Sequence, residues 1–405
     1  MTRANTPQTT LIHHPYVPPA GFEAPQGGVF KASTVFFPSV AAMRKCEWKD
    51  KSAYTYGLHG TPTTYALEER LCHLEGGLQC VLVPSGLAAV ALVGIALLHA
   101  GDEILIPDNV YGPNKTFAEG ELRHWGITHQ VYDPMNPHDL AAKISAKTRL
   151  VWVEAAGSVT LEFPNLPALV AIAKAQKDHR IIVALDNTWG AGLAFAPFDT
   201  GVDISVHALT KYPSGGGDVL MGSVMTRDAD LHLRIQLAHM RLGLGVGAND
   251  AEAVLRSLPS MALRYRTHDE NARILARWCD QQPEFVQVLH PALAGSPGHE
   301  NWKALCQNNT NRAAGGAAGL FSVVLDECFS QAQVDAFCDA LRLFRLGYSW
   351  GGPISLVVPY DLQSMRTTWP AGIARGTVVR FCVGLESVDD LQADIAHALL
   401  QMRGG

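Results

Sequence analysis

The feature that most constrains the fold is a regular alternation of short apolar segments with helical segments in the first half of the chain. Predicted strands lie at residues 80–83, 103–107, 148–154 and 180–186, and predicted helices lie at 66–75, from 87 onward and at 166–178. Nearly continuous apolar strands that alternate with helices are typical of an α/β domain with a largely parallel sheet. Ligands in such sheets bind at the carboxyl ends of the strands. We therefore expect functional residues just after these strands.

The chain is predicted to contain an arm and two domains. Its 405 residues are too many for one small core. Residues 1–60 are rich in Pro, Thr and aromatic residues and show little helical periodicity, which indicates an extended arm that needs another surface to lie on. The pattern changes near residue 258, and we predict a larger domain at 61–256 and a C-terminal domain at 257–405.

The C-terminal part is predicted to be a smaller α/β domain. Predicted helices lie at residues 264–279, 331–344 and 388–402, and predicted strands lie at 320–325 and 377–383. Residues 307–319 are rich in Asn, Ala and Gly, and they are interpreted either as a mobile lid or as a loose surface loop.

Composition excludes several classes of function. The formal net charge is −6, and no run of Lys and Arg forms a basic patch, so we expect no nucleic-acid partner. Residues 81–100 lack charged side chains, but Pro84, Ser85 and Gly86 interrupt them, which favours a buried strand, a turn and a helix over a membrane span. The first ten residues contain no apolar segment like that of a signal peptide, so we expect a cytoplasmic protein without a membrane partner.

The cysteines give no indication of a metal site or of disulfides. There are eight of them, and none forms a Cys-x-x-Cys pair or a Cys/His group with zinc spacing. Reduced thiols and no bound metal are therefore expected.

Three sequence elements together fit the requirements of pyridoxal phosphate. Asp186 ends an apolar strand, where it could form a structural ion pair or keep a pyridine nitrogen protonated. Lys211 lies between an apolar strand and a Gly-rich segment; alone it could be a surface lysine, but with the other elements it could carry the cofactor as a Schiff base. Ser85, Gly86 and Leu87 open a helix whose free N–H groups suit a phosphate.

Two further residues fit the same cofactor. Thr210 precedes the lysine and could also contact the phosphate. Tyr111 follows the strand that ends at residue 107, and it could stack on the ring.

The motifs resemble those of the Cys/Met-metabolism pyridoxal-phosphate enzymes, a fold-type-I group that includes cystathionine β-lyases, γ-lyases and γ-synthases. The matching segments are residues 54–63 (YTYGLHGTPT), 84–86 (PSG), 111–113 (YGP), 186–189 (DNTW), 210–212 (TKY), 348–352 (YSWGG), Arg380 and 384–386 (GLE). The resemblance covers residue 25 to the end. It implies a large cofactor-binding domain with a mainly parallel seven-stranded sheet and a smaller C-terminal α/β domain. It also implies a homotetramer of tight dimers, in which the arm and Tyr56 complete the neighbour's site.

The resemblance also implies roles for individual residues. The implied catalytic residues are Lys211, Tyr111 and Tyr56; the implied cofactor-binding residues are Lys211, Asp186, Tyr111, Ser85, Gly86, Leu87, Thr210 and Tyr56; and the implied substrate-binding residues are Arg380, Ser349, Trp350, Tyr348 and His59. Arg380 would bind the substrate α-carboxylate, since a guanidinium binds a carboxylate through two hydrogen bonds.

The segment around Trp350 favours one reaction within the family. It resembles the cystathionine β-lyases, because γ-acting relatives usually have a smaller aliphatic residue there. The expected reaction is β-elimination of L-cystathionine to homocysteine, pyruvate and ammonia, in methionine biosynthesis. The alternatives are a cystathionine γ-lyase or γ-synthase, a cysteine desulfhydrase, or a non-catalytic binding protein with the same fold.

Two segments depart from the family pattern. Leu58 stands where most relatives have an arginine that reaches the neighbour's cofactor phosphate, so the affinity for the cofactor is expected to be lower by about 1.5–3 kcal/mol unless His59 or the helix N-terminus compensates. Residues 154–158 (EAAGS) replace a usual Glu-Ser-Pro-type segment beside the ring.

Overall fold

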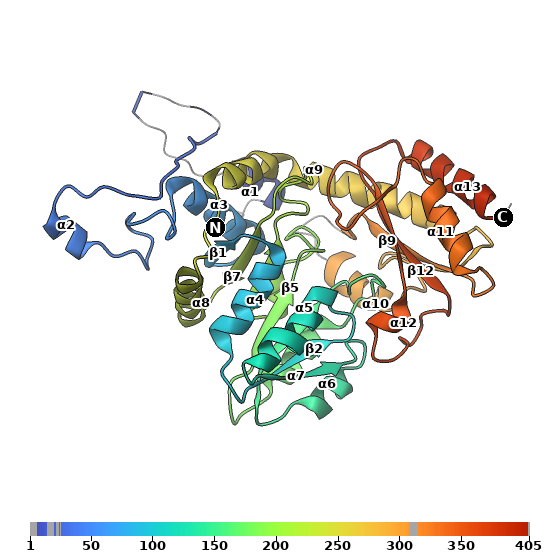
Figure 1. Ribbon diagram of the computed structural model, residues 1–405, viewed down its shortest axis with the longest axis horizontal. Coiled ribbons are helices and arrows are strands. Elements are labelled where there is room, and N and C mark those ends of the chain that lie inside the picture. The colour runs from blue at the N-terminus through green and yellow to red at the C-terminus, as the bar shows by residue number, and fades with distance from the viewer. Residues whose placement is uncertain (1–5, 14–19, 22–23, 25, 308–314, 404–405) are drawn as a thin grey trace.

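The chain folds around two β-sheets that lie at opposite ends of a long helix (Figure 1). The structure is a computed structural model that describes residues 6–13, 20–21, 24, 26–307 and 315–403. Most of the segment 307–319, predicted to be a lid or a loop, lies outside the described residues.

The first sheet has seven strands in the order β1-β7-β6-β5-β4-β2-β3, and only β7 runs antiparallel to its neighbours. The prediction of a mainly parallel seven-stranded sheet is therefore confirmed. Its strands are β1 (Gln79–Val83), β2 (Glu103–Pro107), β3 (Thr128–Tyr132), β4 (Thr148–Glu154), β5 (Ile182–Asp186), β6 (Ile204–Ala208) and β7 (Gly222–Thr226).

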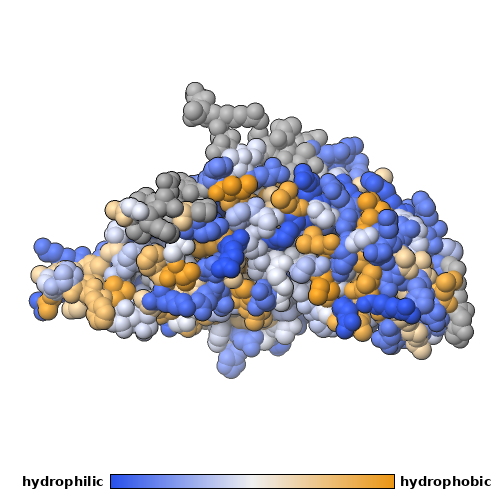
Figure 2. Space-filling view, turned by 90° about the horizontal axis from the view of Figure 1, so that it is seen from above, coloured by the Kyte–Doolittle hydropathy of each residue, from blue (hydrophilic) through white to orange (hydrophobic). Residues whose placement is uncertain are grey.

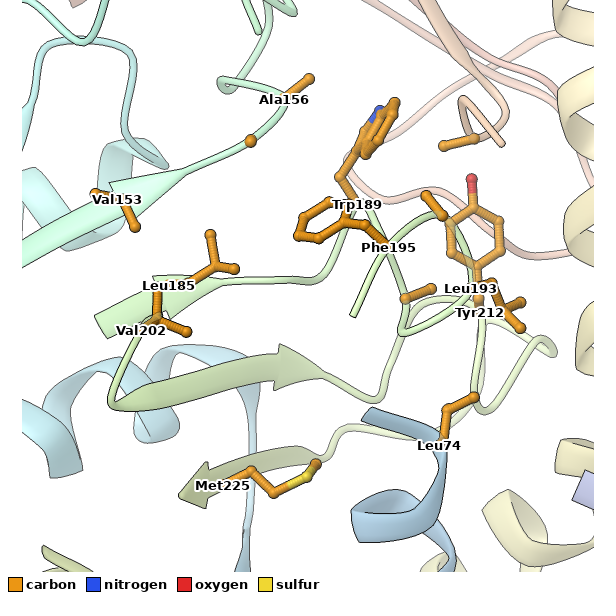
Figure 3. Close-up of a cluster of buried hydrophobic side chains, with 14 of the residues drawn as sticks. Leu74, Val153, Ala156, Leu185, Trp189, Leu193, Phe195, Val202, Tyr212 and Met225 are labelled. Carbon is orange, nitrogen blue, oxygen red and sulfur yellow. The ribbon is translucent and has the colours of Figure 1, made fainter. Parts of the chain in front are cut away.

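Helices cover both faces of this sheet because its strands are apolar on both sides. Along β4, Leu150 and Trp152 pack into the core that α4 and α8 cover, whereas Val151 and Val153 pack into the opposite core, which α3, α7 and the first half of α9 cover. Figure 3 shows part of the second core, with Val153 and Leu74 among its side chains. The helices of this part are α3 (Pro62–Glu75), α4 (Gly86–Leu97), α5 (Gly112–Phe117), α6 (Pro137–Lys143), α7 (Leu166–Lys174), α8 (Ala229–Leu242) and α9 (Ala248–Cys279), with a π-helical turn at Ala118–Leu122 and a 3-10 turn at Pro197–Thr200.

The uncharged segment 81–100 forms β1, a turn and α4, as predicted. Ser85 begins α4, since its hydroxyl oxygen accepts a hydrogen bond from the Ala88 N–H at 3.0 Å. Among the described residues, no helix is both long enough and apolar enough to cross a membrane.

The second sheet has five strands in the order β10-β11-β12-β9-β8, and it packs against the second half of α9 and against α11 and α13. Its elements are β8 (Phe285–Leu289), α10 (His299–Trp302), a π-helical turn at Lys303–Gln307, β9 (Leu320–Leu325), α11 (Gln331–Ala340), β10 (Arg345–Leu346), β11 (Leu356–Tyr360), α12 (Leu362–Met365), β12 (Thr377–Cys382) and α13 (Val388–Arg403). The helix predicted at 331–344 ends early, because the Asp394 carboxylate accepts the N–H groups of Arg342, Leu343 and Phe344.

Helix α9 is longer than predicted. The sequence predicted a helix only from residue 264, but α9 starts at Ala248 and contains Pro259 in its interior. The predicted domain boundary at 256/257 lies inside this helix, and the division into an arm and two domains stays a prediction.

The two short helices of the N-terminal segment lie in different places (Figure 1). Helix α1 (Pro7–Ile12) packs against α3 and α9 and buries Leu11, whereas the part around α2 (Val40–Lys45) extends away from the first sheet. Apolar side chains on the projection around α2 face solvent, among them Phe36 at 93% exposed, Val40 at 56% and Met43 at 49%. Figure 2 shows hydrophobic residues beside hydrophilic ones on this projecting end of the molecule.

Candidate active site

A cleft opens where β4, β5 and β6 end, beside the N-terminus of α4 and next to β12 of the second sheet. Its empty volume, including the open mouth, is about 940 Å³. The predicted site residues that line this cleft are Ser85, Gly86, Leu87, Tyr111, Asp186, Thr210, Lys211, Trp350 and Arg380. The fold therefore brings together residues that are up to almost 300 positions apart, and it does so at the strand ends, where the sequence placed them.

Asp186 ends β5 at the floor of the cleft. Its carboxylate accepts the Thr188 N–H at 2.9 Å, and the Thr188 hydroxyl in turn accepts the Ala208 N–H at 2.9 Å, which fixes Thr188 against β6. Burial raises the pKa of Asp186, and the hydrogen bonds from Thr188 offset part of this rise. A buried carboxylate in this position is stabilised by a partner that carries a proton, such as a pyridinium N–H.

A second buried carboxylate supports this end of the sheet, and the sequence analysis missed it. Glu75, at the end of α3, accepts a hydrogen bond from the Ser205 hydroxyl at 2.5 Å and lies 2.8 Å from Nδ1 of His207. Glu75, Ser205 and His207 are fully buried. This group could have been found from the sequence of the strand at 204–208. Ser205 and His207 are polar residues two positions apart in an otherwise apolar strand, so they share one face of the sheet.

Lys211 lies in the cleft with its amine in a defined position. The Nζ atom donates a hydrogen bond to Oγ of Ser349 at 2.9 Å, and it lies 4.5 Å from the centre of the Trp350 ring. Burial, and then the nearby Arg380 guanidinium, lower the pKa of Lys211 to about 8. A much larger fraction of this amine is therefore neutral near pH 7 than for an exposed lysine, as a nucleophile or a base requires.

A glycine allows the segment of Ser349 and Trp350 to approach the lysine. Gly351 has φ +76°, and a Cβ atom there would lie 2.9 Å from the backbone N of Tyr212. Any larger residue would be strained and would push Trp350 away from Lys211.

The N-terminus of α4 provides an anion site at the cleft. The first N–H groups of a helix have no partner within the helix, and Ser85 satisfies only that of Ala88. The N–H groups of Gly86 and Leu87 therefore remain for a ligand, and the helix dipole favours a phosphate there. The Thr210 hydroxyl also faces the cleft, but it exchanges hydrogen bonds with the backbone of Met221 at 3.2 and 3.3 Å.

Substituting Gly86 by alanine is expected to weaken cofactor binding, because the new Cβ would lie 2.6 Å from Cβ of Ala208 on β6 and would push the helix end off the sheet. Overpacking of this kind costs about 1–3 kcal/mol. The dissociation constant for pyridoxal phosphate, measured from visible absorbance, should rise about fivefold or more. The control is Gly120→Ala, where a Cβ meets open space; an equal loss of affinity in both variants would contradict the expectation.

Arg380, on β12, is only 5% exposed. Its guanidinium carbon lies 5.6 Å from the centre of the Trp350 ring and 5.3 Å from that of Tyr360. Within the described part of the chain, no carboxylate forms an ion pair with Arg380, and its Nε atom is buried without a hydrogen-bond partner. A buried cation without an ion-pair partner can be stabilised by an anionic ligand such as a carboxylate.

Glu154 was quoted in the sequence but not identified as a site residue. It ends β4 directly beside Asp186 in the sheet register, lines the cleft and accepts the Tyr111 N–H at 2.8 Å. Burial, and then the Asp186 carboxylate, raise the pKa of Glu154 well above its ordinary value. Glu154 therefore favours its protonated form more than an exposed glutamate does, and its carboxyl group fixes the backbone of Tyr111.

Four predicted site residues do not line this cleft: Ser349, which reaches the site only through its hydrogen bond with Lys211, and Tyr348, Tyr56 and His59. Tyr348 is 83% exposed, and Tyr56 is 47% exposed on the arm. His59 stacks on Trp48 with ring centres 4.3 Å apart and shares a hydrogen bond of 2.7 Å with Thr55. The side chains of Tyr348, Tyr56 and His59 thus lie outside the chain's own cleft, and their roles in the site stay predictions.

Leu58, which stands where most members of the resembled family have an arginine, packs against its own chain. Leu58 lies against the chain's own surface, at Gly245, where an added Cβ would be 2.9 Å from Cδ1 of Leu58. All eight cysteines are free thiols in the structure. No group of three or more metal-ligating side chains is found in the part of the chain that the structure describes.

The sequence and the structure are similar to those of known proteins. The family model of the Cys/Met metabolism PLP-dependent enzymes matches residues 8–400. A putative cystathionine beta-lyase of Rhizobium johnstonii is 42% identical over 91% of this chain and 89% of its own length, and the cystathionine beta-lyase MetC of Escherichia coli is 35% identical over 90% of this chain and 91% of its own length.

A solved structure has the same fold. Cystathionine gamma synthase from Xanthomonas oryzae pv. oryzae, in complex with cystathionine, has a TM-score of 0.87 and 28% identity over 99% of this chain and 100% of its own. The fold-type-I architecture expected from the motifs is thereby confirmed. The chain belongs to the family of Cys/Met metabolism PLP-dependent enzymes, and its cofactor is pyridoxal phosphate.

Proposed function

We propose that this protein is a cystathionine β-lyase, which converts L-cystathionine and water to homocysteine, pyruvate and ammonia. The observation that carries the proposal is the position of Trp350, which contacts the Lys211 amine on the one hand and the Arg380 guanidinium on the other. The base and the carboxylate-binding residue therefore border the same aromatic side chain, and an α-amino acid can reach both. The names of the β-lyase relatives support the choice of substrate.

The residues of the cleft fit pyridoxal phosphate. The N-terminus of α4 would bind the phosphate, Asp186 would face the pyridine nitrogen, Lys211 would carry the aldehyde carbon, and Tyr111 would lie beside the ring. When bound, the cofactor withdraws electrons from the substrate Cα. The two features that argue for the fit are the raised pKa of the buried Asp186 and the lowered pKa of Lys211.

The reaction follows from the positions of the side chains. Arg380 binds the substrate carboxylate, and this orients the Cα–H bond toward Lys211. The neutral Lys211 amine then removes the Cα proton, and Asp186 would hold the pyridine nitrogen of the bound cofactor in its protonated form. The carbon–sulfur bond at Cβ breaks, and the Lys211 ammonium protonates the leaving sulfur, with assistance from Tyr111. Water hydrolyses the resulting enamine to pyruvate and ammonia.

The products test the proposal. Purified holoenzyme is supplied with L-cystathionine, and pyruvate, 2-oxobutyrate and homocysteine are quantified. Pyruvate and homocysteine in equal amounts would support the β-lyase. Formation of 2-oxobutyrate would assign the protein to the γ-acting members instead, and no turnover of cystathionine together with pyruvate from cysteine would indicate a desulfhydrase.

Uptake of the cofactor by the apoprotein should depend on the pH through Lys211. The rate is expected to rise as the pH approaches about 8 and to level off above it, because only the neutral amine attacks an aldehyde. Below that pH the rate should fall about tenfold per pH unit. Stopped-flow absorbance measures it, and Arg380→Leu should shift the midpoint upward, since the Arg380 charge lowers the pKa of Lys211. A midpoint above pH 10 in the wild-type protein would contradict the expectation.

We also propose that the chain forms a homotetramer of tight dimers, with the arm placed on a neighbouring subunit. The exposed apolar side chains around α2 support this, since Phe36 at 93% exposed is costly in water. In such a dimer Tyr56 and His59 would approach the neighbour's cleft. Sedimentation velocity tests the proposal, and a monomer at micromolar concentration would contradict it.

A further inference from the structure

Tyr360 contacts the cation that the proposed function assigns to the substrate carboxylate. It ends β11, which pairs with β12 in antiparallel register. Val358 lies directly opposite Arg380, and Tyr360 lies two residues further along on the same face of the sheet. The Tyr360 ring centre is consequently 5.3 Å from the Arg380 guanidinium carbon.

The surroundings of Arg380 are unusual for a buried cation. Neither of the two rings that contact it, those of Trp350 and Tyr360, carries a negative charge. Among the described residues, no acidic side chain pairs with it. The face of an aromatic ring attracts a cation without occupying its N–H donors. Two rings therefore restrict the guanidinium without the negative charge of a protein carboxylate, which would compete with an anionic ligand. The side chains of Tyr360 and Cys382 also accept hydrogen bonds from it.

Tyr360 differs from Trp350 in its relation to the cleft. Trp350 lines the cleft and also contacts Lys211, whereas Tyr360 is not among the lining residues. Tyr360 also packs against a small apolar cluster that includes Leu362 and Val378. Tyr360 can thus act on the ligand only through Arg380.

We propose that Tyr360 is a positioning residue, which fixes the orientation of the Arg380 guanidinium for the α-carboxylate of an amino-acid substrate. This inference rests on the role of Arg380 in the proposed function. It predicts that the loss of the Tyr360 ring weakens only ligands that carry a carboxylate. A purely structural role for the ring predicts an equal loss for all ligands of the cleft.

The test compares two amines on the holoenzyme. L-Alanine carries a carboxylate and has no leaving group, and ethylamine has the same amine on a two-carbon chain without the carboxylate. Their dissociation constants are measured from the change in the visible absorbance of the bound cofactor. For Tyr360→Leu, the constant for L-alanine should rise about threefold to thirtyfold, which is the size of a cation–π contact, while the constant for ethylamine stays unchanged. Tyr360→Phe keeps the ring and removes only the hydroxyl that accepts a hydrogen bond from Arg380, so its constant for L-alanine should rise less than in Tyr360→Leu, and its constant for ethylamine should stay unchanged.

Further variants distinguish a failure of the inference on Tyr360 from a failure of the role assigned to Arg380. Tyr360→Met fills similar volume without a ring and replaces the leucine variant if that one does not fold. An equal change for both amines, an unchanged L-alanine constant in the ringless variants, or the same loss in Tyr360→Phe would overturn the inference. Arg380→Leu tests the underlying assignment. If this variant keeps the wild-type preference for L-alanine over ethylamine, the role of Arg380 fails, and the inference on Tyr360 fails with it.

Discussion

Replacing Lys211 by alanine is expected to abolish pyruvate formation from L-cystathionine. The Lys211 amine is the only amine that lines the cleft in the described part of the chain, and its pKa of about 8 suits it to remove and return a proton. Loss of a positioned general base alone lowers kcat about 10²–10⁴-fold, and here the same group also protonates the leaving sulfur. We therefore expect at least the upper end of this range, measured as initial rates of pyruvate release.

Two controls separate the chemistry of Lys211 from its structural contribution. Lys211→Arg keeps a cation near Ser349 but supplies no neutral amine, and it should be as inactive as the alanine variant. Lys177→Ala removes an exposed lysine and should leave the rate unchanged. Because an amine buried without a carboxylate partner does not favour folding, Lys211→Ala should not lower the melting temperature of the apoprotein. Elimination within tenfold of the wild-type rate in Lys211→Ala would remove it from the mechanism.

The sequence was most informative where one short segment determines the structure. The run from Gln79 to Leu97 could be divided correctly, since Pro84 and Gly86 interrupt an otherwise apolar stretch and Ser85 caps the helix. Asp186 and Lys211 stood out as charged residues at or after the ends of apolar strands, and these ends meet at one edge of a parallel sheet.

The parts that could not be predicted depend on contacts between distant segments. The Glu75 carboxylate reaches His207 across 132 positions, because the C-terminal end of α3 lies beside the face of β6 that carries Ser205 and His207. The raised pKa of Glu154 follows from its burial and from its register with Asp186 on the next strand, and the contact of Tyr360 with Arg380 follows from the register of β11 with β12. No local pattern encodes a register, since it is set by the packing of whole strands.

Substituting Asp186 by asparagine is expected to lower kcat on the order of 10²-fold or more while the fold is retained. The amide has the same shape and its oxygen can still accept the Thr188 N–H, but it cannot stabilise a positive charge on the pyridine nitrogen. The loss of one preorganised electrostatic group in an active site costs about 10²–10³-fold in kcat. Pyruvate release measures the rate, and Asp178→Asn, at an exposed acid, is the matched control. A rate within about threefold of the wild type would contradict the role of Asp186.

The same substitution has an independent effect on the stability of the apoprotein, and its sign follows from the pKa of Asp186. Burial raises this pKa above its value in the unfolded chain, so the folded protein retains a proton that the unfolded chain releases above about pH 4. The wild-type apoprotein therefore loses stability as the pH rises through the raised pKa, and Asp186→Asn avoids this loss. The melting temperature of the variant should equal that of the wild type near pH 4 and exceed it near pH 7. If the variant is instead less stable than the wild type at pH 7, other groups of the protein already stabilise the Asp186 carboxylate. The argument for a pyridinium partner at this position then fails.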